Sequence, residues 1–120
     1  MKVTPEYHEK IGNIVFASVY PALVNKVVRK GKTEEELRDL IKWLTGFTDK
    51  QLNNIIDSKA TYKEVFNKSI LHPDAKKITG VICGYRIEEI DNDVTKFVRQ
   101  LDKIVDELAK GRPLEKIKRL

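Results

Sequence analysis

Apolar residues recur along most of this chain at spacings of three and four positions, which places their side chains on one face of an α-helix. One stripe near the carboxyl end has seven members: Val94, Phe97, Val98, Leu101, Ile104, Val105 and Leu108. A second stripe consists of Leu37, Leu40, Ile41 and Leu44. No segment alternates cleanly with a period of two. The pattern therefore predicts an all-α fold in which a longer carboxyl-terminal helix follows several short ones.

Capping boxes led by threonine mark the starts of three short helices. In such a box the threonine hydroxyl accepts the amide hydrogen of the residue three positions on, whose side chain reaches back to the threonine amide. The three pairs are Thr33 with Glu36, Thr48 with Gln51, and Thr61 with Glu64. We therefore expect three short helices joined by tight turns, the first of them ending at Gly46.

The amino-terminal region predicts two helices that meet at a proline. Thr4 and Pro5 form a start signal for the first helix, which is expected to run toward Tyr20. Pro21 should end or kink it. With the segments that follow, we expect a compact single-domain bundle of about six or seven short helices spanning residues 1–120, a length sufficient for an ordinary apolar core.

The segment from Ile78 to Ile90 is the hardest to assign. It is rich in β-branched residues and contains Gly80 and Gly84, features that favour a strand. A lone strand would have no pairing partner among helical neighbours. We therefore expect a helix capped by Asp74, on which the two glycines leave a bare patch for close helix packing, and the strand remains an alternative.

Composition supports a folded domain, with 41% hydrophobic and 34% charged residues. The longest apolar stretch, residues 14–24, is interrupted by Ser18 and Pro21 and is too short to cross a membrane. The polar amino terminus favours a cytoplasmic location. The single cysteine, Cys83, permits neither an internal disulfide nor a cysteine-rich zinc site.

The net charge of +5 is concentrated in the last twelve residues. Residues 109–120 contain one acid, Glu115, and carry a net charge of +4. Their basic residues are Lys110, Arg112, Lys116, Lys118 and Arg119. This basic segment is a candidate for weak nucleic-acid binding through phosphate contacts, although cations near helix ends are also ordinary solvated charges.

Four sequence blocks resemble a bacterial family of uncharacterised proteins, the domain of unknown function 2200. They are FASVYP at residues 16–21, WLTGF at 43–47, ITGVICGYR at 78–86 and LDKIVDELAKG at 101–111. The resemblance extends from about residue 15 to residue 119 and implies a compact all-helical domain without an assigned activity. Residues 69–74 differ from the family pattern, which has Ala-Pro and Asn-Pro there, so we expect no role that depends on that asparagine.

Aromatic side chains and an arginine at predicted helix ends form the leading candidate site. Trp43, Tyr85 and Arg86, with Cys83 and His72, are expected to line a groove for a protein or a small ligand. The alternative is that these aromatic residues pack the helix ends into the core. A binding module is favoured over an enzyme because no catalytic constellation stands out.

An enzyme remains a further alternative, with Cys83 as nucleophile, His72 as base and Arg86 as the neighbouring positive charge. Against this, a free cysteine beside two glycines is expected to be a small buried residue. No cofactor or metal site is expected, because neither histidine has a second ligand at helical spacing. Asp106 is expected to form an ion pair with Lys110 on the helix surface. The sequence does not define the oligomeric state.

Overall fold

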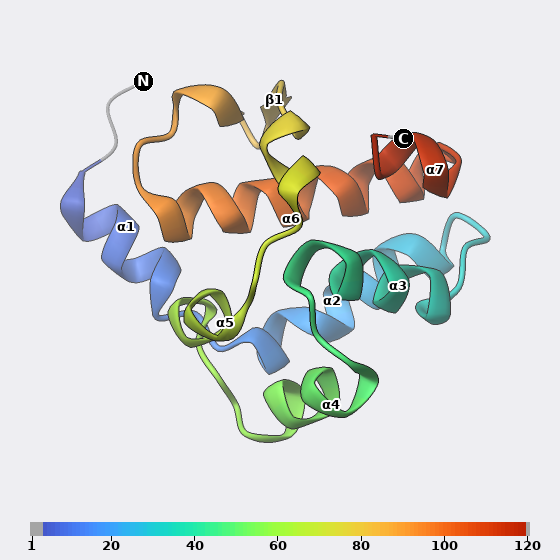
Figure 1. Cartoon of the computed structure of the whole chain (residues 1–120), viewed down its shortest axis with the longest axis horizontal. Coiled ribbons are helices and arrows are strands. Elements are labelled where there is room, and N and C mark those ends of the chain that lie inside the picture. Colours follow the sequence, from blue (N-terminus) through green and yellow to red (C-terminus); the bar gives the residue numbers. More distant parts are fainter. Residues whose placement is uncertain (1–3, 120) are drawn as a thin grey trace.

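A long helix, α6 (Asp93–Ala109), crosses the middle of the molecule, and the other elements pack around it (Figure 1). The computed structural model describes residues 4–119. The helices before α6 are α1 (Pro5–Gly12), α2 (Phe16–Val28), α3 (Glu34–Thr45), α4 (Asp49–Asp57) and α5 (Tyr62–Lys68), and α7 (Leu114–Ile117) follows it. Two short 3-10 helices, η1 (Pro73–Lys77) and η2 (Ile87–Glu89), flank a hairpin of β1 (Val81–Ile82) and β2 (Tyr85–Arg86). The described part of the chain thus confirms a mostly helical fold of seven α-helices.

The apolar stripe predicted for the last long helix faces the centre of one continuous core. Phe97, Leu101, Ile104 and Leu108 of α6 are each at most 1% exposed. They join a cluster to which all the other α-helices except α1 contribute buried apolar residues, and α1 adds the partly buried Ile11. Between residues 4 and 119, none of the helices has the length and apolarity needed to span a membrane.

All three capping boxes are confirmed. The hydroxyls of Thr33, Thr48 and Thr61 accept the amide hydrogens of the residues three positions on, at 3.1 to 3.2 Å. The side chains of Glu36, Gln51 and Glu64 accept the threonine amide hydrogens in return. Local sequence therefore fixes where α3, α4 and α5 begin.

The boundary predicted at Pro21 is wrong, because α2 continues through this proline. The first helix ends at Gly12 instead, and the chain then pairs with the start of α5. Phe16 donates its amide hydrogen to the Ala60 carbonyl at 2.8 Å, and Tyr62 donates to the Ile14 carbonyl at 2.9 Å. Pro21 lies in the second turn of α2, where its missing N–H removes only one helical hydrogen bond.

The helix predicted between Ile78 and Ile90 is also wrong. The chain forms an antiparallel hairpin in which Val81 pairs with Arg86 and Ile82 with Tyr85. The two residues between these strands, Cys83 and Gly84, have φ angles of 53° and 81°. Positive φ at both central positions defines a tight turn suited to hairpins and is incompatible with an α-helix. The strand β1 therefore pairs with β2 from the same segment and needs no partner elsewhere in the fold. The glycine packing patch predicted for a helix does not form.

Candidate functional site

Trp43 and His72 are brought together by the turn that follows α3. Gly46 caps this helix in the left-handed conformation, with φ of 77°. A Cβ atom at this position would lie 2.9 Å from the Ile70 carbonyl oxygen, so glycine permits the close approach of residues 70–72. Ile70 and His72 then donate their amide hydrogens to the carbonyls of Thr45 and Leu44. These bonds satisfy the last carbonyls of α3 and fix the loop against its end.

The indole of Trp43 stacks on the imidazole of His72. The ring centroids are 4.7 Å apart, and the planes meet at 28°. The His72 side chain is 34% exposed, and its Nδ1 accepts the amide hydrogen of Asp74 at 3.0 Å. Because Nδ1 is occupied as an acceptor, the neutral ring carries its hydrogen on Nε2. That hydrogen is available for an external acceptor.

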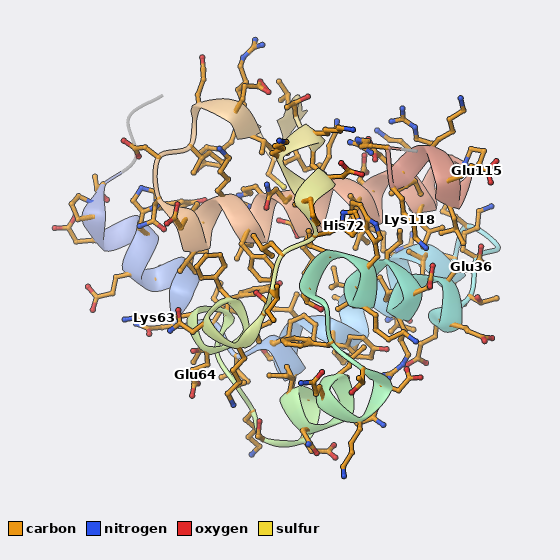
Figure 2. The ribbon with its side chains drawn as sticks, in the orientation of Figure 1. Glu36, Lys63, Glu64, His72, Glu115 and Lys118 are labelled. Carbon is orange, nitrogen blue, oxygen red and sulfur yellow. The ribbon has the colours of Figure 1, made fainter. Side chains whose placement is uncertain are left out.

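The basic carboxyl-terminal segment packs against the middle of α3 and the end of η1. Lys118 Nζ lies 2.6 Å from Asp39 Oδ2, and Arg119 Nε contacts the Lys77 carbonyl oxygen at 3.5 Å. Asp39 and Trp43 are four residues apart and therefore occupy adjacent turns of one helix face. Figure 2 labels His72, which directly precedes η1, and Lys118, which directly follows α7. We call Asp39, Trp43, His72 and Lys118 the α3 junction.

The sequence-predicted groove residues Tyr85 and Arg86 lie on the hairpin and have other partners. The Tyr85 ring faces the guanidinium of Arg99 at 4.9 Å and the Tyr7 ring at 5.7 Å. The Tyr7 hydroxyl raises the pKa of Tyr85 above its ordinary value. Arg86 lies 3.9 Å from carboxylate oxygens of both Glu88 and Glu89. No hydrogen bond, ion pair or ring contact within residues 4–119 joins either residue to Trp43.

Cys83 is exposed, so the expectation that it is buried is wrong. It occupies the tip of the hairpin, because the tight turn places it at the first central position. In the described part of the chain, no hydrogen bond or ion pair links it to His72 or Arg86. The three residues of the enzyme hypothesis are therefore not assembled into a catalytic group.

Arg99 was missed by the sequence analysis, although it organises the region beneath the hairpin. It donates a short hydrogen bond to the Tyr7 hydroxyl and contacts Asp102 Oδ2 at 3.0 Å. Burial raises the pKa of Asp102, and Arg99 opposes this rise. Arg99 stands between apolar residues of the α6 stripe, and no local pattern indicates that it meets a tyrosine 92 positions away. Its charge is already balanced by Asp102, so this cluster holds α1, α6 and the hairpin together.

Most of the basic residues in segment 109–120 are paired with acids of the helical body. Lys110 contacts Asp106 at 2.9 Å, as predicted, and Arg112 and Arg119 both bind Glu107, at 2.8 and 2.6 Å. Lys118 is held by Asp39. Lys116 is exposed and has no ion pair with a described residue. The segment is a docked part of the fold rather than a free basic tail.

Asp102 and Asp106 face cations on α6 and α2. Burial tends to raise the pKa of Asp106, but hydrogen bonds from Lys110 and Lys26 outweigh it and hold the pKa below its ordinary value. Within residues 4–119, no three His, Cys, Asp or Glu side chains are grouped so that they could hold a metal ion.

The fold and the α3 junction define a small helical protein with a compact polar and aromatic surface site. The chain belongs to the family described as uncharacterised protein conserved in bacteria, DUF2200, whose model matches residues 10–119. This match confirms the family resemblance seen in the sequence blocks. No match was found among curated proteins.

The chain is also similar to a solved structure titled uncharacterised protein SP1917. The two share 41% sequence identity with a TM-score of 0.84, and the match covers 91% of this chain and 90% of the other. The fold therefore recurs in a related protein. Neither the family nor this structure has an assigned activity, and the function is unknown.

Proposed function

We propose that this protein is a binding module whose ligand occupies the α3 junction. The observation that carries the proposal is the Trp43–His72 stack one helical turn from the Asp39–Lys118 ion pair, because the junction joins an aromatic surface to several hydrogen-bond donors. These residues come from three separate parts of the chain, and backbone hydrogen bonds and an ion pair hold them in place. A preorganised site of this kind lowers the entropic cost of binding.

The donors of the α3 junction favour a ligand that carries an acidic group. His72 can donate from Nε2, and Lys118 has three ammonium hydrogens, of which the contact with Asp39 Oδ2 uses one. Trp43 is half-buried, and its exposed part offers an apolar surface next to these donors. An organic anion with a flat body, or an acidic side chain of a partner protein, fits this combination.

Trp43 is the only tryptophan in the chain, so its fluorescence reports on this site alone. Titration with benzoate, phenyl phosphate and a short peptide of Glu and Phe should change the emission in a saturable way for at least one probe. We expect Lys118→Gln to weaken that binding about tenfold, since one charge-assisted hydrogen bond contributes roughly 1.5 kcal/mol.

The matched control is Lys116→Gln, which removes the same charge two positions earlier, within α7, where the lysine has no ion pair with a described residue. It should leave the affinity unchanged. Equal loss in both variants would show that only the net charge matters and would refute a specific site. An unchanged emission with every probe would also count against the proposal.

Nucleic-acid binding through residues 109–120 would need several cations to contact phosphates at once. It is less well supported, because four of the five basic side chains already face carboxylates. Catalysis by Cys83 is less well supported because His72 and Arg86 are engaged elsewhere. A cytoplasmic location is part of our proposal, and the exposed, unpaired thiol of Cys83 supports it because reducing compartments preserve such thiols.

A further inference from the structure

A concave site lies between α1, the start of α5 and the turn before α6. It is an open groove of about 560 Å³. Six of its lining residues carry the argument below: His8, Glu9, Gly12, Lys63, Asp91 and Asn92. The groove is separate from the α3 junction, since none of its lining residues belongs to that junction.

The walls of this groove are fixed by bonds between elements distant in sequence. The backbone pairing of Val15 with Thr61 holds the α1–α2 connection against the start of α5. His8 Nδ1 lies 2.6 Å from the hydroxyl of Thr95, which is 1% exposed. This contact orients the imidazole and leaves Nε2 as its available ring nitrogen. Gly12 has no side chain to fill the groove, and a Cβ there would lie 3.6 Å from Lys63 and 3.7 Å from Val94.

Charges of both signs line the groove and are not neutralised by one another. Glu9, Lys63 and Asp91 form no ion pair or hydrogen bond through their side chains with any residue between 4 and 119. Figure 2 shows Lys63 extending from α5 past the end of α1, whereas the neighbouring Glu64 points away. Asn92 accepts the Thr95 amide hydrogen through Oδ1, so its NH₂ group remains free to donate.

We propose that this groove binds a free α-amino acid. The ammonium group of such a ligand would face Glu9 and Asp91, and its carboxylate would face Lys63 and the amide hydrogens of Asn92. A simple anion would meet two carboxylates, and a simple amine would leave Lys63 without a partner. Only a small zwitterion matches both signs of charge in one groove of this size.

The test is a nuclear magnetic resonance titration of the full chain with the common L-amino acids, recording backbone amide shifts. We expect saturable shifts at residues 8–13, 61–64 and 91–95 for at least one amino acid. Its N-acetyl form lacks the ammonium group and its amide form lacks the carboxylate. Each blocked form should bind roughly tenfold more weakly, the loss expected for one charge-assisted contact.

Two variants assign the charges within the groove. Lys63→Gln should weaken binding of the free amino acid but not of its amide, which lacks the carboxylate. Asp91→Asn should weaken binding of the free amino acid but not of its N-acetyl form, which lacks the ammonium group. Lys50→Gln and Asp57→Asn, on the exposed surface of α4, are the matched controls and should change neither affinity. The proposal is overturned if no amino acid gives saturable shifts, if the blocked forms bind equally well, or if the groove variants behave like the controls.

Discussion

Glu107 shows how a single carboxylate ties the carboxyl-terminal segment to the body of the molecule. It is 7% exposed and receives hydrogen bonds from both Arg112 and Arg119. Arg119 also donates to the Ile117 carbonyl, at 2.7 Å, and Ile117 is fully buried. Position 107 therefore determines whether α7 and Lys118 stay in place beside α3.

Glu107→Gln should destabilise the protein by about 2 to 3 kcal/mol, because it leaves the largely buried guanidinium of Arg119 without its charged partner. Urea unfolding monitored by circular dichroism measures this change. Glu115→Gln, an exposed substitution on α7, is the control and should change the unfolding free energy by less than about 0.5 kcal/mol. A similar small effect at both positions would contradict the role assigned to Glu107.

Tyr62 makes the stability of the fold depend on pH at the alkaline end. Burial raises the pKa of its hydroxyl above the ordinary value of 10.0. In the unfolded chain this group ionises near pH 10, whereas in the folded protein it stays protonated to higher pH. The unfolded state is therefore favoured progressively as the pH rises above about 10.

Tyr62→Phe removes this ionisation. Between about pH 9 and pH 11, the free energy of unfolding of the variant should therefore fall by roughly 1 kcal/mol less than that of the wild type. Urea unfolding of the variant and of the wild type at both pH values measures this difference in the free energy of unfolding. If the variant and the wild type lose stability in parallel, Tyr62 does not remain protonated in the folded protein.

The hairpin is the element that the sequence analysis assigned wrongly. Ile78, Val81, Ile82 and Tyr85 satisfy a helical spacing, and periodicity alone does not distinguish this from two very short strands. The informative signal was local, since a residue followed by glycine, here between the β-branched Ile82 and the aromatic Tyr85, can form a two-residue turn. A two-residue strand is too short to show an alternating pattern. The pairing of β1 with β2 could therefore be predicted only from the turn between them.

The turn itself can be tested by Cys83→Asn. Asparagine adopts the left-handed conformation more readily than cysteine, and Asn-Gly is a favoured pair in this turn. Because Cys83 is exposed, the change removes no core packing. We expect a gain of about 0.5 kcal/mol, or a rise in Tm of roughly 2 °C. Gly84→Ala should have the opposite effect, and destabilisation by both changes would contradict this turn geometry.

Helices α3, α4 and α5 were predictable because their start signals are local. Thr33, Thr48 and Thr61 each cap a helix through residues only three positions away. The α3 junction was predicted only in part. The sequence singled out Trp43 and His72, but their contact depends on the path of the chain after Gly46, and the pairing of Lys118 with Asp39 spans 79 positions. Such long-range contacts leave no signal in local spacing.

On the scale of the whole molecule, the positive charge of the last twelve residues does not form a separate basic surface. The carboxylates of Asp39 on α3 and of Asp106 and Glu107 on α6 bind four of its five basic side chains. The net charge of +5 therefore does not indicate a free basic tail, because ion pairs hold the carboxyl-terminal segment against the helical body. By docking there, this segment places Lys118 against Asp39, one helical turn from Trp43.

Our proposed function for this protein is the binding of an acidic ligand at the α3 junction. The most direct measurement is a map of chemical-shift changes across the full chain, recorded while a probe that alters Trp43 emission is titrated in. We expect the largest shifts on the Trp43 indole N–H and on residues 70–74 and 116–119. Shifts concentrated instead on the hairpin around Tyr85 and Arg86, or spread evenly over the basic side chains, would contradict it.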